Sequence, residues 1–179
     1  MTSCMPWEKG KVPHGYWKKD QHKKDAIDWL FGTKLKWSDD MIKEKLTVQV
    51  IKDHGLGGLV YTEFKGNAYS FVEIYTNGRI KPWEMKKTPK GIFQEASVQI
   101  KAVKWLFEQK LKWTDDEVKE KLSASTFREH GLSSLFAQYD NYYDLLNLAY
   151  PDRFNPWEMT MGVPRGYWKS REHGRKAIE

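Results

Sequence analysis

The chain repeats itself with a nearly fixed period. Pro6-Trp7-Glu8 returns as Pro82-Trp83-Glu84 and again as Pro156-Trp157-Glu158. Residues 27–46 match residues 103–122 at 13 of 20 positions without a gap, at a spacing of 76 residues. A fixed period of this size indicates one folding unit copied in tandem. We therefore expect function to be shared between the copies, so that recurring residues matter more for it than residues that occur once.

The period predicts two modules, at residues 1–81 and 82–155, and a partial third repeat at residues 156–179. The third copy stops at Ile178-Glu179, inside its own first helix. Three explanations stay open. The tail caps the second module as a closing repeat does in solenoids, the chain is a fragment of a longer array, or another chain completes the unit.

Each module has the start and stop signals of short helices, and no sustained alternation predicts a strand. Side chains that cap helix starts precede acidic first turns, and glycine follows a helix end, where it supplies the left-handed conformation. We predict an all-α fold. The expected helices are roughly 18–32 and 95–109, then 39–46 and 115–122 after Ser38 and Thr114, then 48–54 and 124–130 after Thr47 and Ser123, then 56–65 and 132–139, and finally 69–75 and 142–150.

Large aromatic residues recur in register and predict the core, because a small module needs side chains that bury a large area. Stacking on unpaired bases is the alternative for those in the Gly-Tyr-Trp segment beside the lysines. Trp7 and Trp17 are expected to pin the extended start of module 1 to its helices. The residues predicted to be core in the two first helices are Trp29, Leu30, Leu35, Trp105, Leu106 and Leu111.

The net charge of +6 and the sequence pI near 9.2 favour a polyanionic partner such as nucleic acid. The basic residues gather before and along the first helix of each copy, where they oppose the helix dipole. Contact with phosphates would explain that placement, and a solvated lysine face is the alternative. The residues predicted to contact a nucleic-acid backbone are Lys18, Lys19, Lys23, Lys24, Lys86, Lys87, Lys90, Arg165, Lys169, Arg171 and Arg175.

The third and fourth helices, joined at His-Gly-Leu, have the outline of a helix-turn-helix. In DNA-binding versions the second helix lies in the major groove and presents its first residues to base edges. A plain structural corner is the alternative. The residues predicted to read bases are Tyr61, Thr62, Lys65, Ser133, Ser134, Gln138 and Asn141.

Signals for catalysis and metal binding are missing from the sequence. The five histidines and the single cysteine, Cys4, show no zinc-ligand spacing, and Asp39-Asp40 and Asp115-Asp116 follow helix caps. We predict no enzyme activity, no metal and no cofactor. No apolar run approaches the ~18 residues that span a bilayer, and no secretory signal is visible, so we expect a cytoplasmic protein without a membrane partner.

The motifs occur in the order Pro-Trp-Glu, Gly-Tyr-Trp, Trp-Leu-Phe, His-Gly-Leu and Ala-Tyr-Pro. This order resembles a poorly characterised family of tandem helical modules of Gram-positive bacteria and their phages. Copy 1 departs from it with Tyr75-Thr76-Asn77-Gly78 in place of Ala149-Tyr150-Pro151, and copy 2 with Gly91-Ile92-Phe93. The resemblance implies nucleic-acid binding and supplies no active site.

Together these observations predict a nucleic-acid-binding protein whose partner is double-stranded DNA. Such a protein would act as a regulator or as a factor with which a phage takes over its host. The alternative is a protein-binding scaffold, or an inhibitor of a host protein, because clustered aromatic and arginine side chains also form protein hot spots. The sequence leaves the oligomeric state open.

Overall fold

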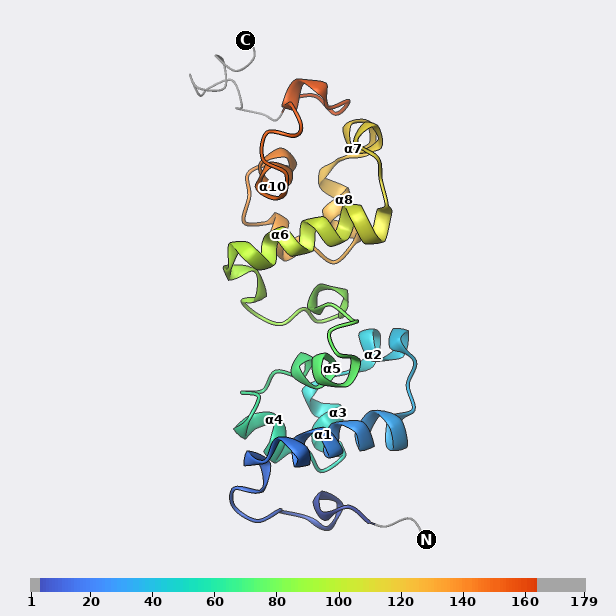
Figure 1. Cartoon of the computed structure of the whole chain (residues 1–179), viewed down its shortest axis with the longest axis vertical. Coiled ribbons are helices and arrows are strands. Elements are labelled where there is room, and N and C mark those ends of the chain that lie inside the picture. The colour runs from blue at the N-terminus through green and yellow to red at the C-terminus, as the bar shows by residue number, and fades with distance from the viewer. Residues whose placement is uncertain (1–3, 164–179) are drawn as a thin grey trace. The chain divides into compact units, whose positions relative to one another are not determined.

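The computed structural model describes residues 4–163, and all regular structure in this part of the chain is helical (Figure 1). The predicted all-α class is confirmed. The polypeptide divides between Lys90 and Gly91 into two compact units, which we call unit 1 and unit 2. The four residues predicted as basic contacts near the end of the chain, Arg165, Lys169, Arg171 and Arg175, lie outside the described residues.

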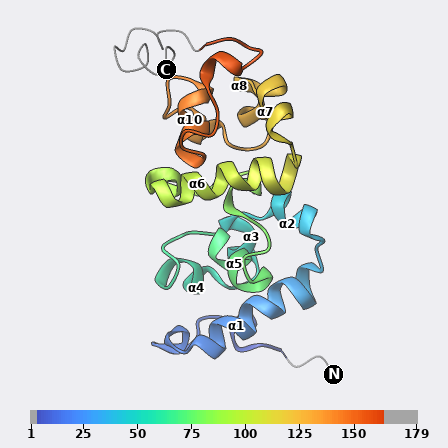
Figure 2. The ribbon, with the colours of Figure 1, turned by 45° about the horizontal axis from the view of Figure 1, so that its top comes forward.

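Unit 1 contains five short α-helices, with 3-10 turns at both of its ends. Figures 1 and 2 place α5 against α1. The elements are η1 (Pro6–Lys9), η2 (Tyr16–Lys18), α1 (Asp20–Trp29), η3 (Leu30–Leu35), α2 (Asp39–Lys45), α3 (Val48–Asp53), α4 (Gly57–Thr62), α5 (Tyr69–Thr76) and η4 (Pro82–Glu84).

The elements of unit 2 follow the order of η2 to η4 in unit 1, and α10 packs against α6 as α5 does against α1. Its elements are η5 (Ile92–Gln94), α6 (Ala96–Lys104), η6 (Trp105–Leu111), α7 (Asp115–Lys121), α8 (Ala124–Glu129), α9 (Ser133–Phe136), α10 (Tyr142–Ala149) and η7 (Pro156–Glu158).

The boundary between the units lies after the position predicted at residue 81. The cause is the second Pro-Trp-Glu segment, which packs on unit 1. Glu84 forms an ion pair with Lys43 at 3.0 Å, and the backbone N–H of Lys86 donates to the Lys43 carbonyl. Met85 belongs to the core of unit 1. The third copy closes unit 2 in the same way, since Glu158 pairs with Lys119 at 3.3 Å and Thr160 N–H donates to the Lys119 carbonyl.

The helix starts follow the predicted caps. Ser38 and Thr47 accept hydrogen bonds from the backbone of Met41 and Val50. In unit 2, Thr114 and Glu117 form the predicted capping box, in which each side chain accepts from the other residue's backbone N–H. These bonds satisfy amide donors that a helix start otherwise leaves open.

The first helices differ from the prediction because each continues as a π-helix. The segments η3 and η6 are π-helical, and each ends at a lysine in the left-handed conformation, Lys36 (φ 47°) and Lys112 (φ 54°). Leu35 and Leu111 are the last residues of these segments and are half-buried instead of core. Leu35 still packs against the core of unit 1, at its edge.

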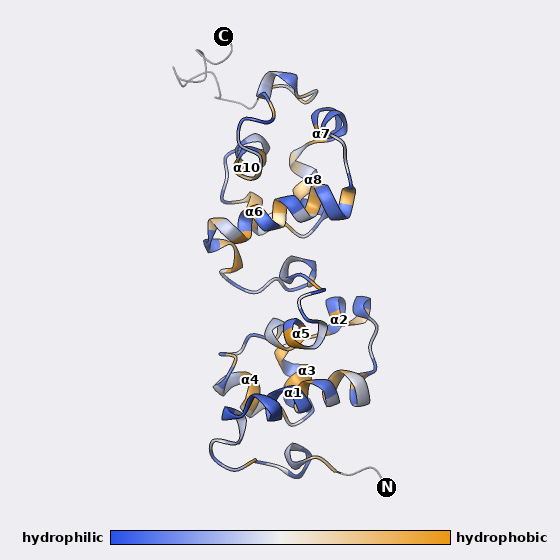
Figure 3. Cartoon of the chain, in the orientation of Figure 1, coloured by the Kyte–Doolittle hydropathy of each residue, from blue (hydrophilic) through white to orange (hydrophobic). Residues whose placement is uncertain are grey.

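The core is formed by the predicted aromatic and aliphatic positions. The most hydrophobic segments, orange in Figure 3, occur within the helices of both units. Trp29, Leu30, Trp105 and Leu106 are buried as predicted. Trp7 and Trp17 are buried and pin the segment that precedes α1: the ring centroid of Trp7 lies 5.7 Å from that of Trp17 and 5.4 Å from that of Trp29. Trp157 differs from its two counterparts, Trp7 and Trp83, because it is 41% exposed.

Candidate nucleic-acid interface

Helices α3 and α4 of unit 1 form the tight corner that the sequence predicts. His54 ends α3, with its ring Nδ1 2.8 Å from the Val50 carbonyl, and Gly55 follows at φ +80°. A β-carbon at position 55 would lie 2.6 Å from the carbonyl oxygen of Trp7, so both the backbone conformation and the available space require glycine here. Unit 2 repeats the corner with His130 and Gly131. The helix-turn-helix outline is therefore present in both units.

Part of the first turn of α4 lies beside the segment that precedes α1, and Gly58 in this turn is exposed. We call residues 6–18 the lead. A β-carbon at Gly58 would lie 3.4 Å from Nε1 of Trp17, so this face of α4 lies against the lead. Of the predicted base-reading residues, Tyr61 and Thr62 are exposed, and Thr62 Oγ1 donates to the Gly58 carbonyl. Lys65 lies beyond the end of α4, in the left-handed conformation (φ 50°).

In unit 2 the predicted base-reading side chains make bonds inside the unit. Helix α9 has four residues and is shorter than expected, so Gln138 and Asn141 lie beyond it. Ser133 Oγ donates to the Arg128 carbonyl, and Ser134 is exposed. Asn141 is the N-cap of α10: its Oδ1 accepts from the backbone of Asp144 at 2.9 Å, and its Nδ2 donates to the Asp144 carboxylate.

Gln138 belongs to a small network that ties the end of α9 to α6. Gln99 Nε2 donates to Gln138 Oε1 and to the Phe93 carbonyl, and Tyr139 donates its hydroxyl proton to Gln99 Oε1. The expectation that Gln138 and Asn141 sit on a free recognition helix is corrected by these contacts. Sequence spacing placed both residues near the corner but did not show which groups their amides would bind.

The lysines around α1 divide into free and paired side chains. Lys18, Lys19 and Lys24 are exposed, and none of them has an ion pair within residues 4–163. Lys23 is half-buried, 2.9 Å from Asp20 and 3.5 Å from Glu63. Its hydrogen bond to Asp20 raises the pKa of the ammonium group. A phosphate would have to displace these carboxylates from Lys23, which makes Lys23 the least available of the four.

Three predicted lysines from separate segments meet around one pocket of unit 1. Lys87 and Lys90, after η4, and Lys65, in the loop after α4, line a cavity of about 580 Å³, and the start of α3 lines it too. We call it the lysine pocket. No Asp or Glu is among the residues that line it, and its three lysines have no ion pair in the described part of the chain. Lys86, beside them in sequence, is instead 3.6 Å from Glu44. Distant segments form this cluster, so no local sequence signal could have shown it.

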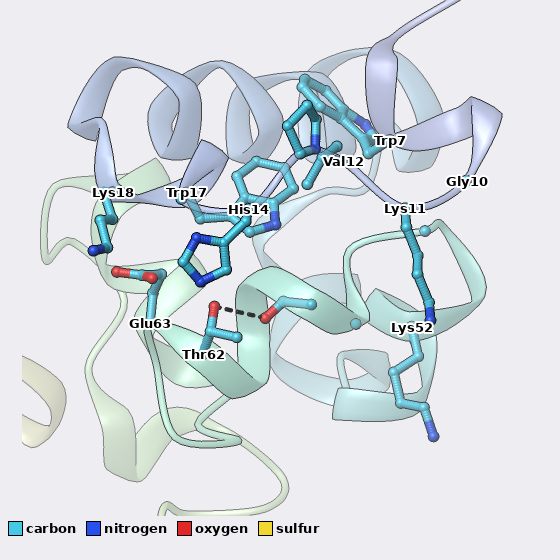
Figure 4. A pocket seen from close by; sticks show the side chains of 15 residues that line it. Trp7, Gly10, Lys11, Val12, His14, Trp17, Lys18, Lys52, Thr62 and Glu63 are labelled. Atoms are coloured by element: carbon cyan, nitrogen blue, oxygen red, sulfur yellow. Dashed lines mark hydrogen bonds between the residues drawn. The ribbon is translucent and has the colours of Figure 1, made fainter.

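A second cavity, of about 720 Å³, lies between the lead and the corner of unit 1 (Figure 4). We call it the lead pocket. Trp17 and Val12 lie at its back, and His14 extends over it toward Thr62. Lys11 and Lys52 lie at one end, and Lys18 and Glu63 at the other. Lys11, His14 and Lys52 are far apart in the sequence or carry no motif, and only the fold brings them together.

Within residues 4–163, no group of three or more His, Cys, Asp or Glu side chains could hold a metal ion. The same part of the chain contains no helix that is both long enough and apolar enough to cross a membrane. The arrangement of charged groups in unit 1 is suited to holding anions.

Comparison with known proteins yields one similarity. Residues 71–155 match the model of a family described as "Protein of unknown function (DUF4046)". The matched span runs from within α5 of unit 1 through α10 of unit 2, which is under half of the chain. Neither the curated proteins nor the solved structures gave a match.

Proposed function

We propose that this chain binds nucleic acid, with duplex DNA as its partner, and that unit 1 supplies the binding surface. The observation that carries the proposal is the lysine pocket. Three lysines without ion pairs, Lys65, Lys87 and Lys90, surround a cavity that no carboxylate lines. Like charges kept close together without counter-charges lower stability through repulsion unless an anion neutralises them.

The distribution of charge along the chain also supports unit 1 as the binding unit. Residues 1–90 contain 17 Lys and Arg against 11 Asp and Glu, and residues 91–179 contain 13 of each. The whole net charge of +6 therefore belongs to unit 1. The exposed lysines Lys18, Lys19 and Lys24 add to this surface. A concentrated positive field raises the rate at which a polyanion associates and supplies nonspecific affinity.

Backbone contacts give affinity without sequence information. Any selection of sequence by unit 1 would fall to Tyr61 and Thr62, the exposed polar residues of α4. Tyr61 is 56% exposed, so most of its ring is open to a ligand and is not used to pack the corner. We therefore propose a protein with strong phosphate binding and modest base preference, a property suited to a regulator or to a factor with which a phage takes over its host.

One observation favours the alternative, a protein partner, for unit 2. Trp157 is 41% exposed and Met161 is 63% exposed, close together in the chain at the end of the unit. Exposed tryptophan and methionine are enriched where proteins meet. A chain with a DNA-binding unit 1 and a protein-binding unit 2 is consistent with both features.

The test is fluorescence anisotropy with a short random-sequence duplex over a range of salt concentrations. We compare the parent with the triple variant Lys65→Gln, Lys87→Gln, Lys90→Gln. The charge-matched control is Lys101→Gln, Lys110→Gln, Lys112→Gln in unit 2. Its three lysines are exposed, and Lys112 has the same left-handed backbone as Lys65.

Each lost phosphate contact should reduce the slope of log K against log salt by about 0.9. The slope for the unit 1 variant should therefore be smaller than the parental slope by about three times that amount, and the control should keep the parental slope. Equal losses in both variants would show that net charge alone drives binding. A parent that does not bind the duplex at low salt would refute the proposed function.

A further inference from the structure

The lead pocket has the dimensions and lining of a small-molecule site. Its volume of about 720 Å³ falls within the range of roughly 300–1,000 Å³ that is usual for such sites. Its apolar lining comes from Val12, Pro13 and Trp17, and five glycines contribute to the wall without side chains.

The pocket has a positive end. Lys11 and Lys52 lie together there (Figure 4), both are exposed, and neither makes an ion pair in the part of the chain that the structure describes. The acid of the pocket, Glu63, lies at the opposite end and is 3.5 Å from Lys23. The charges therefore match a ligand that has an anionic group at one end and a flat apolar body behind it.

The cavity depends on small residues that unit 2 does not share. At the spacing of the repeat, Gly57, Gly58 and Thr62 correspond to Ser133, Ser134 and Gln138. Gln138, at the position of Thr62, accepts a hydrogen bond from Gln99 Nε2 at 3.3 Å. Because frame residues such as Gly55 and Gly131 are the same in both units, the shorter side chains of unit 1 are not needed to make the corner.

We propose that the lead pocket binds a nucleotide, with the base against Val12, Pro13 and Trp17 and the phosphate between Lys11 and Lys52. A nucleotide would use both the charged end and the apolar lining of the pocket, whereas inorganic phosphate would use only the lysines. The nucleotide can come from two sources, a free mononucleotide or an unpaired residue of a strand. This site is separate from the lysine pocket and does not depend on duplex binding.

The experiment is isothermal titration calorimetry on the whole chain with dAMP, deoxyadenosine, inorganic phosphate and a short single-stranded oligodeoxyadenylate. We expect saturable binding of dAMP with one site per chain. Deoxyadenosine and inorganic phosphate should each bind at least about tenfold more weakly, because each lacks one half of the recognition and a charge-assisted hydrogen bond contributes about that factor. A strand that binds more tightly than dAMP through the same pocket identifies the strand as the source, and a strand that binds no more tightly identifies the free nucleotide.

Two variants locate the site. Lys11→Gln with Lys52→Gln changes exposed residues and should reduce dAMP affinity about tenfold while deoxyadenosine binding is unchanged. Thr62→Gln copies the residue of unit 2 into the pocket and should weaken dAMP and deoxyadenosine alike. The matched control is Lys101→Gln with Lys110→Gln, two exposed lysines of unit 2, which should bind dAMP as the parent does.

Absence of saturable dAMP and oligonucleotide binding would overturn the inference, as would parental dAMP affinity in the double lysine variant. Equal affinity for dAMP and inorganic phosphate would also overturn it, since the base would then contribute nothing. If dAMP fails while the duplex still binds through Lys65, Lys87 and Lys90, this inference falls and the proposed function stands. The reverse result leaves the nucleotide site without the duplex surface.

Discussion

Replacing Gly55 by alanine tests how firmly the lead is attached to the α3–α4 corner. Two costs add at this position. The first is the left-handed backbone at φ +80°, which costs an alanine about 1–2 kcal/mol. The second is the added β-carbon, which would lie 2.6 Å from the Trp7 carbonyl oxygen. Either the lead or the corner must move by several tenths of an ångström to make room for it.

Overpacking of this kind costs roughly 1–3 kcal/mol, so Gly55→Ala should lower the free energy of unfolding of unit 1 by about 2–5 kcal/mol in total. Gly78→Ala is the matched control. Gly78 has φ +72°, and an added β-carbon there meets no atom within 4 Å. It should therefore lose only the backbone contribution of about 1–2 kcal/mol.

Urea unfolding followed by tryptophan fluorescence and by far-ultraviolet circular dichroism measures both variants. Trp7 contacts both Trp17 and Trp29, so the emission of these tryptophans should report on displacement of the lead even before unit 1 unfolds. If Gly55→Ala and Gly78→Ala lower stability by the same amount, the lead is not held against the corner at Trp7. The lead pocket would then lack its upper wall.

Two further predictions concern stability. Trp105→Ala empties a buried site in unit 2 and should cost roughly 3–5 kcal/mol in urea unfolding, whereas Trp157→Ala, at a position that is 41% exposed, should cost much less; similar losses for the two would contradict the assigned core. Burial, with smaller effects from Glu73 and Glu84, raises the pKa of Tyr69 from 10.0 to about 12, so its contribution to stability should be complete below pH 10 and lost as the pH rises through 12. Tyr69→Phe, which also loses the hydrogen bond to the Ile80 carbonyl, should flatten the pH dependence of the melting temperature in that window, and an unchanged profile would show that Tyr69 titrates normally.

Features that depend on neighbours in sequence could be predicted. Ser38, Thr47 and Thr114 cap helices because a hydroxyl reaches an amide three residues ahead, and that relation is visible in the letters. The same rule could have identified Asn141, which is followed three residues later by Asp144 and caps α10. Its placement on a recognition helix was wrong because α9 ends at Phe136 and Asn141 caps the next helix.

Features that depend on contacts between distant segments could not be predicted. The spacing of Pro-Trp-Glu predicts the period of the repeat. It does not predict whether each Pro-Trp-Glu segment packs on the helices before it or on those after it. The third copy closes the unit before it through Lys119, and the second does so through Lys43. The lysine pocket has the same origin, because Lys65 meets Lys87 and Lys90 only after η4 has packed on unit 1.

The comparison of the two units changes the expectation that recurring residues carry the function. Recurring residues build the frame: the caps, the His-Gly corner and the buried tryptophans. The proposed binding features occur once. In unit 1, Lys23 lies 3.5 Å from Glu63, and at the same two positions unit 2 joins Gln99 to Tyr139 without charge. Trp17 faces Gly58 in unit 1, where the repeat gives Phe93 and Ser134 in unit 2. The ring at this contact is therefore smaller in unit 2, and the residue opposite it is larger. Under the proposed function, both units keep the recurring frame, while the net positive charge, the lysine pocket and the lead pocket belong to unit 1.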